Sequence, residues 1–114
     1  MTTITRSNIV QETLAITDTT LYTLGSTVTN AFITKAIASN STTTPATITI
    51  NIVQSGGSVA STNEYVIEET IPANQSVVLY KLIGEQLDPG DFISAIASVT
   101  ATISLRISVK ELSN

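Results

Sequence analysis

The sequence of 114 residues contains no cysteine, histidine or tryptophan, and only 12% of its residues are charged. Without cysteine, the chain can form no disulfide framework and no cysteine-based zinc site, and it has no thiol nucleophile. Without histidine, it lacks the commonest general base and metal ligand in proteins. A nucleophilic serine needs a nearby base, so only a Ser–Lys pairing remains, and neither Lys35 nor Lys81 lies in a recognisable motif. We therefore expect no enzymatic activity, no catalytic residues, no cofactor and no metal site.

Basic residues are few and scattered, and the net charge is −4. The chain has no basic run, so binding of nucleic acid by neutralisation of its phosphates is not expected. No stretch reaches the roughly 18 apolar residues that a membrane helix requires. Residues Met1–Thr17 also lack the apolar block of a signal peptide. From these features we expect neither nucleic acid nor a membrane as a partner, and a chain that stays where it is made or joins an assembly.

Two segments alternate strictly between apolar and polar residues. A period of two predicts strands with one buried face and one wet face, as is typical of antiparallel sheets. The polar residues between the apolar ones, Asn51 among them, are expected on the wet face. The residues expected to face inward are Ala46, Ile48, Ile50 and Ile52 in the first segment (ATITINIV, 46–53), and Ala101, Ile103, Leu105, Ile107 and Val109 in the second (ATISLRISVK, 101–110).

Further strands are expected at Thr19–Leu24, Ala31–Ser39, Glu64–Ile71, Ser76–Ile83 and Phe92–Val99, with a weaker strand within Ile9–Thr17. Alternation in the second of these puts Ile33 and Ile37 on one face, and Phe32, Ala36 and Ala38 on the other. Seven or eight short strands between turn clusters predict an all-β fold, an antiparallel β-sandwich of jelly-roll or Ig-like type. We expect a single domain over residues 19–114, preceded by an N-terminal arm or extra strand over residues 1–18.

Acidic residues gather around the best-specified turn, Asp88-Pro89-Gly90-Asp91. This tetrapeptide suits a type II turn, because proline fixes φ at the second position and glycine accepts a positive φ at the third. Glu85, Asp88 and Asp91 could offer oxygen ligands to calcium. Their spacing does not match an EF-hand loop, so we favour turn solvation and keep calcium as the alternative.

Other polar and aromatic residues have simple structural interpretations. Glu68 and Glu69 are adjacent, so on a strand they point to opposite faces and make a poor catalytic pair, although one of them could guard a sheet edge. Asn40 and Asn74 begin glycosylation triplets that we interpret as loop sequence. Core or rim packing is the favoured interpretation of the aromatic residues Tyr22, Phe32, Tyr65, Tyr80 and Phe92.

Three phrases of the chain form a familiar pattern: TLYT at Thr20–Thr23, IPANQSVVL at Ile71–Leu79 and LDPGDFI at Leu87–Ile93. Their order resembles that in a small β-sandwich structural protein of tailed-bacteriophage virions, over about residues 19–109. The resemblance implies a virion component without catalytic residues, located in the virion and assembled in the host cytoplasm. Its partners would be the major capsid protein or other virion proteins.

The resemblance therefore predicts a capsid decoration (cement) protein that stabilises the shell by bridging capsid subunits. A neck, tail or head-fibre accessory protein is the alternative within the virion. A carbohydrate- or surface-binding β-sandwich module is the alternative from another class, and it requires an exposed aromatic patch. By analogy with capsid cement proteins we expect a homo-oligomer, a trimer by preference, in which the segment 1–18 reaches a neighbouring subunit.

Overall fold

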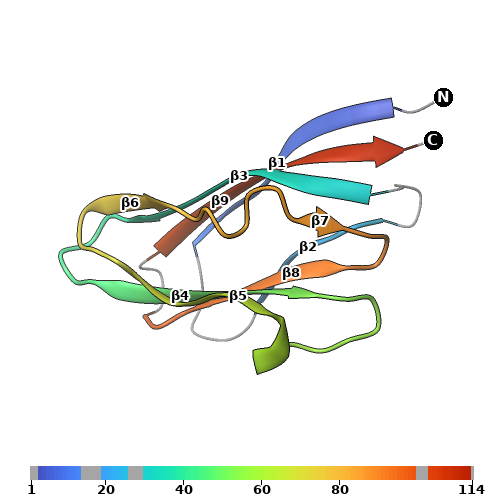
Figure 1. Cartoon of the computed structure of the whole chain (residues 1–114). Coiled ribbons are helices and arrows are strands. Elements are labelled where there is room, and N and C mark those ends of the chain that lie inside the picture. The colour runs from blue at the N-terminus through green and yellow to red at the C-terminus, as the bar shows by residue number, and fades with distance from the viewer. Residues whose placement is uncertain (1–2, 14–18, 26–29, 100–102, 114) are drawn as a thin grey trace.

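The computed structural model describes residues 3–13, 19–25, 30–99 and 103–113, and almost all of this chain lies in β-strands or the turns between them. Two antiparallel sheets pack face to face as two layers (Figure 1). The fold is an all-β sandwich, as predicted from the alternation. The described residues include one short 3-10 helix, η1 (Ser61–Asn63), and no helix that could span a membrane.

Each layer has a defined strand order. One sheet has the order β1-β9-β3-β6, with β7 also paired to β3, and the other has the order β2-β8-β4-β5. In the first sheet the strands are β1 (Thr3–Thr13), β9 (Ile103–Ser113), β3 (Asn30–Asn40), β6 (Gln75–Val78) and β7 (Gln86–Leu87). In the second they are β2 (Thr19–Thr23), β8 (Phe92–Ala97), β4 (Ala46–Val53) and β5 (Glu64–Ile71).

The connectivity is that of a jelly roll. Strands β6 and β7 both pair with β3, so they act as one interrupted strand and leave eight in all. Strand β1 then pairs with β9, and β2 pairs with β8. Strand β3 pairs with the interrupted strand β6–β7, and β4 pairs with β5. This is the pattern of one long hairpin folded over into two sheets. Of the two types expected from the sequence, the structure is therefore the jelly roll and not the Ig-like sandwich.

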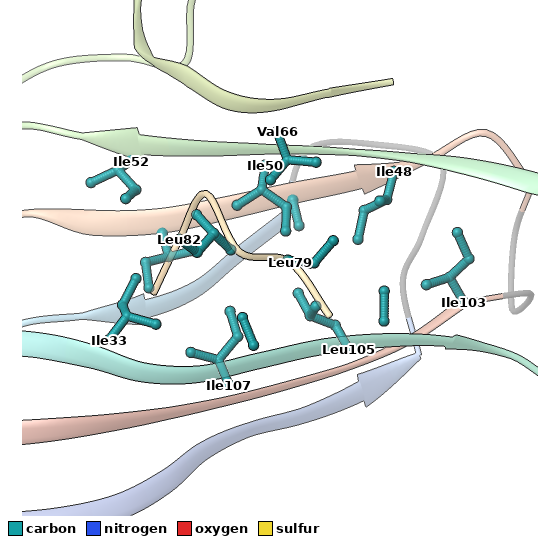
Figure 2. Close-up of a cluster of buried hydrophobic side chains, with 14 of the residues drawn as sticks. Ile33, Ile48, Ile50, Ile52, Val66, Leu79, Leu82, Ile103, Leu105 and Ile107 are labelled. Carbon is teal, nitrogen blue, oxygen red and sulfur yellow. The ribbon is translucent and has the colours of Figure 1, made fainter. Parts of the chain in front are cut away.

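The core lies between the layers and is built from the two alternating segments. The predicted inward rows of β4 and β9 are buried, and Figure 2 shows their isoleucine and leucine side chains facing one another across the sandwich. Burial of each such side chain contributes about 1.5–3 kcal/mol. Ala101, which was predicted to begin the second row, lies outside the described residues.

Strand β3 departs from the predicted pattern because it contains a bulge. Its register with β9 shifts between Ile33 and Lys35, so the alternation changes phase there. As a result Ile33 lies on the same buried side as Ala36 and Ala38, not opposite them, and Ile37 faces outward and is half-buried. The predicted assignment of faces in this strand was therefore wrong, because a single extra residue moves every later side chain to the other face.

The segment predicted as one strand over Ser76–Ile83 is a strand followed by a turn. Strand β6 ends at Val78, and the chain then makes a compact turn in which Leu82 N–H donates to the Leu79 carbonyl over 3.1 Å. Both leucines are buried, and Figure 2 shows them between the two sheets. The turn ends at Gly84, whose φ of +91° suits glycine. The backbone then returns to β3, where Gly84 N–H donates to the Ile33 carbonyl over 2.7 Å.

The remaining strand predictions differ from the structure mainly at their ends. Glu64–Ile71 is confirmed with the same bounds, and β2 and β8 end one and two residues earlier than predicted. The weaker strand expected within Ile9–Thr17 corresponds to the longer β1, and residues 14–18 lie outside the described part of the chain. Strand β7 was missed, because a two-residue strand leaves no periodic signal.

The first prediction concerns the Leu79–Leu82 turn. Replacement Leu82→Ala should lower the free energy of unfolding by about 3 kcal/mol, since it leaves a cavity between the sheets. Tyr80→Ala is the matched control, because this side chain of the same turn is 78% exposed and should change stability by less than about 0.5 kcal/mol. Urea unfolding followed by circular dichroism measures both values. Equal losses in the two variants would contradict the inward role of Leu82.

Candidate interaction surfaces

The Asp88–Asp91 turn is held by its own aspartates. The Asp91 amide donates to the Asp88 carbonyl over 3.0 Å, and Gly90 has a φ of +90°, as predicted for a type II turn. The Asp91 carboxylate accepts hydrogen bonds from the Asp88 amide at 2.9 Å and from the Ser55 amide at 3.0 Å. Gln86 donates its side-chain amide to Asp88 over 2.9 Å. The aspartates thus tie the turn to itself and to the loop after β4.

Glu85, the third member of the predicted acidic cluster, acts elsewhere. Burial and a hydrogen bond to the Glu85 carboxylate raise the pKa of the Tyr65 hydroxyl. Among the described residues, no three acidic side chains come together as a group that could hold a metal ion. Glu85 therefore has a different role from Asp88 and Asp91, although the three residues are close in the sequence.

An open pocket of about 440 Å³ lies beside this turn. It is bounded by the loop between β4 and η1, by η1 itself, by the start of β5 and by β7 with the turn that follows. Figure 1 shows the β4–η1 loop and the β7–β8 turn at the same end of the sandwich. Its polar and aromatic lining includes Gln54, Ser58, Thr62, Tyr65, Gln86 and Asp88. This pocket was not predicted, because its walls combine two stretches that are distant in the sequence, residues 52–65 and 86–91.

One side of the sandwich carries edge strands that are charged or broken. Strand β5 is an edge strand, and it contains Glu64, Glu68 and Glu69. Its pairing with β4 shifts register twice, and Glu68 has the unusual φ of +43°. The other sheet ends on this side in β6 and β7, which are short. Charges, bulges and short strands are features that prevent another strand from pairing with an edge. The predicted edge-guarding role of Glu68 or Glu69 is therefore consistent with their place on an edge strand.

The opposite side of the sandwich carries less charge, although both of its strands also contain a register shift. Strands β1 and β2 are the edge strands there, and they lie beside each other. Strand β1 has 11 residues, of which only Arg6 and Glu12 are charged, and β2 (TTLYT) has no charged residue. Within the described chain, neither strand has a partner on its outer edge. We call this pair of strands the β1–β2 side.

Tyr22 links the two sheets near the β1–β2 side. Its hydroxyl donates to the carboxylate of Glu111. Glu111 continues the inward row of β9 beyond Val109, so its charge would otherwise face the end of the core. Burial and the Glu111 carboxylate raise the pKa of Tyr22. Sequence reasoning assigned Tyr22 to packing and missed this contact, whose partners are 89 residues apart.

Asn40 is a structural residue. Its side chain is buried, donates to the carbonyls of Thr44 and Ile71 over 2.8 and 3.1 Å, and accepts from the Thr42 amide at 2.9 Å. This network closes the corner between β3 and β4 and joins it to the end of β5. Asn74 has a φ of +56° in the turn before β6. The interpretation of both triplets as loop sequence is therefore only partly right, because Asn40 ends β3, and Gln75 and Ser76 begin β6.

The aromatic residues divide into two groups. Tyr22, Phe32 and Phe92 are half-buried, which agrees with packing. Tyr80 is 78% exposed, so the packing interpretation is wrong for this residue. Tyr65 is 38% exposed and lines the pocket.

Comparison with solved structures finds the same fold in assembly proteins. A chain from Bacillus endospore appendages, described as disulfide-linked pili, is 14% identical with a TM-score of 0.55, over 100% of this chain and 90% of that one. A chain of infectious bursal disease virus, Gx strain, is 11% identical with a TM-score of 0.51, over 97% of this chain and 32% of that one. The VP2 subviral particle of the same virus gives 9% identity and a TM-score of 0.50, over 99% and 33%.

This chain therefore spans about a third of the length of the two viral chains. At these identities the likeness shows the fold alone. No protein-family model matches the sequence, and comparison with curated proteins finds no match.

The second prediction separates two costs at the turn glycines. Gly84 and Gly90 both have positive φ, but a Cβ at Gly84 would meet nothing within 4 Å, whereas a Cβ at Gly90 would lie 2.7 Å from the Cβ of Ser55. Gly84→Ala should therefore cost only the backbone strain, about 1 kcal/mol, and Gly90→Ala at least about 2 kcal/mol. Chemical denaturation measures both. In a Ser55→Gly background the loss caused by Gly90→Ala should fall to that of Gly84→Ala, and no such rescue would refute the close approach.

The third prediction concerns alkaline pH. The pKa of Tyr22 is raised in the folded state. The stabilisation that comes from its neutral form is therefore fully present below about pH 10, where a tyrosine in the unfolded chain ionises. This stabilisation is lost as the pH rises toward the pKa of Tyr22 in the folded state. Tyr22→Phe should lower the free energy of unfolding by about 1 kcal/mol at neutral pH. It should also make the free energy of unfolding fall less between pH 10 and pH 11. Urea unfolding at each pH measures this. Tyr80→Phe, which alters an exposed hydroxyl, should leave the decline unchanged; an equal effect of both would exclude the special role of Tyr22.

Proposed function

We propose that this chain is a non-enzymatic structural subunit of a protein assembly, and more specifically a decoration (cement) protein of a tailed-phage capsid. The observation that carries the proposal is the contrast between the two sides of the sandwich. Strand β5 has three glutamates among its 8 residues, whereas β1 and β2, with 11 and 5 residues, together contain only two charged residues. Such an asymmetry suits a subunit that contacts its neighbours on one side of the sandwich and not on the other.

The physical reason lies in the backbone of an edge strand. An edge presents a row of N–H and C=O groups that can pair with a strand of another chain. Threonine and serine side chains are inexpensive to remove from water compared with charged ones, so such an edge can be covered by a neighbour at low cost. The sequences of β1 and β2 contain only two charged residues, Arg6 and Glu12.

The fold comparisons support an assembly role. The similar chains come from pili of endospore appendages and from virus particles, according to the descriptions of those structures. The appendage pili are described as disulfide-linked, and this chain contains no cysteine. Its contacts would therefore be non-covalent, and many weak contacts would add up through multivalency.

The resemblance of the TLYT, IPANQSVVL and LDPGDFI phrases to tailed-phage proteins favours the capsid as the location. In this proposal the protein forms a homo-oligomer, a trimer by analogy, and bridges subunits of the major capsid protein. The N-terminal segment 1–18 contains β1, which pairs with β9 inside the sandwich, and in this proposal the outer edge of β1 is the part that meets a neighbouring subunit.

A filament or fibre component is the second candidate, in the form of a neck, tail or head-fibre accessory protein. The likeness to an appendage chain over 90% of that chain favours this alternative. Stoichiometry discriminates between the two. Mass analysis of purified particles should find hundreds of copies for a capsid protein and about a dozen for a neck or tail protein. Recovery of the protein only as a free monomer, never with particles, would refute both.

The fourth prediction tests the β1–β2 side directly. The double variant Thr20→Lys/Thr23→Lys puts two charges on exposed positions of β2 and should weaken self-association at least tenfold, because a covering strand would have to desolvate them. Thr70→Lys is the matched control, since Thr70 is exposed on the guarded strand β5. Analytical ultracentrifugation over a concentration series measures the association constant. If Thr70→Lys weakened association as much as the double variant, the interface would lie elsewhere.

A further inference from the structure

We propose that the pocket between η1, β5 and β7 binds a neutral sugar residue of a glycan. This binding site goes beyond the structural role above and does not depend on it. Strands β5 and β7 lie at the edges opposite the β1–β2 side, so the pocket stays open when that side is covered by a neighbour. One subunit could then hold an assembly partner and a glycan at the same time.

The size and openness of the pocket suit one or two sugar rings. Its volume of about 440 Å³ lies within the range of roughly 300–1,000 Å³ that is typical of small-molecule sites. An open site at the end of the sandwich also lets the rest of a glycan chain extend into solvent.

Tyr65 offers an aromatic surface in this pocket. It is 38% exposed, and burial together with the nearby Glu85 carboxylate raises the pKa of its hydroxyl. A tyrosine provides a large apolar surface with few rotatable bonds, so little conformational entropy is lost when a ligand covers it. The apolar C–H face of a sugar ring can stack on such a surface.

Several polar groups in the pocket are free to bind hydroxyls. Among the described residues, the side chains of Gln54, Ser58 and Thr62 line the pocket without a hydrogen bond to the protein. The Asp88 carboxylate uses one oxygen for Gln86 and keeps the other. Amides, hydroxyls and a carboxylate together can both donate to and accept from the hydroxyls of a sugar.

The charge of the pocket selects against anions. Asp88 and Asp91 line it, and none of the described lining residues is basic. A phosphate or a carboxylated sugar would meet only negative charge, whereas a neutral sugar can donate hydroxyl protons to these carboxylates. The electrostatics therefore favour a neutral sugar.

The walls of the pocket are formed before any ligand binds. Asn63 donates to the Ser58 carbonyl over 2.9 Å and accepts from the Ala60 amide at 3.1 Å and from the side chain of Asn51 at 2.6 Å. Asn51 itself is buried, so its predicted place on the wet face was wrong, and its side-chain amide is satisfied by the Ala60 carbonyl and by Asn63. On the other wall, Asp91 binds the Ser55 amide. A loop held at both ends loses less entropy on binding, so weak ligands can be retained.

The fifth prediction is tested by NMR titration of the ¹⁵N-labelled full-length chain. The probes are the methyl glycosides of glucose, galactose, mannose and N-acetylglucosamine, with methyl glucuronide and sialic acid as anionic comparators. We expect at least one neutral glycoside to shift the amide signals of the β4–η1 loop and of Tyr65, with a dissociation constant on the order of 1 mM. Binding of the anionic sugars alone, or shifts confined to other surfaces, would overturn the proposal, as would no shift with any neutral probe at 50-fold this concentration (about 50 mM).

Variants assign the binding to the pocket. Tyr65→Ala should weaken binding at least tenfold, Tyr65→Phe should retain it because the ring remains, and Tyr80→Ala should have no effect because Tyr80 lies outside the pocket lining. Gln54→Ala, on an exposed loop position, provides a second loss-of-binding variant if Tyr65→Ala fails to fold. Unchanged affinity in Gln54→Ala and in a folded Tyr65→Ala would refute the site. Oligomer size does not enter this measurement, so its outcome is separate from that of the proposed assembly role.

Discussion

The structure depends on one constraint, the burial of two alternating rows of side chains against each other. Strands β4 and β9 each carry a row of buried aliphatic side chains at alternate positions, and each strand lies in the interior of its own sheet. Neither row can be removed from water by its own sheet, so the two sheets must pack face to face. The resulting core contains aliphatic side chains from both layers, and the titratable groups lie at its ends or outside it.

Because the core is aliphatic, the charged and polar groups that could bind a partner lie at the edges and ends of the sandwich. A jelly roll has four edge strands, and here the two pairs differ in kind. Strand β5 carries three glutamates that resist pairing, whereas β1 and β2 together contain only two charged residues. The pocket lies on the side of the sandwich formed by β5 and β7. The two sides can thus serve different partners, because what covers one side leaves the other accessible.

The parts of the fold that were predictable depend on neighbours in the sequence. Strict alternation identified β4 and most of β9, and the Asp88–Asp91 turn followed from the conformational preferences of proline and glycine. The errors have equally definite causes. An apolar run without a period could not reveal that Leu82 enters the core from a turn, and a single bulge reversed the faces of β3 after Ile33. The candidate pocket was not predictable at all, since it joins segments that are distant in the sequence.

An all-β chain with two strongly amphipathic strands, tight turns and no histidine- or cysteine-based chemistry follows from residue type and local spacing. Which strands pair, and so which edges remain open, follows from the three-dimensional packing. The packing also brings Tyr22 to Glu111 across 89 residues and places Tyr65 in the same pocket lining as Gln54 and Asp88. The physical reason is that pairing and packing are contacts between distant segments, and local spacing carries no information about which distant segment will be the neighbour.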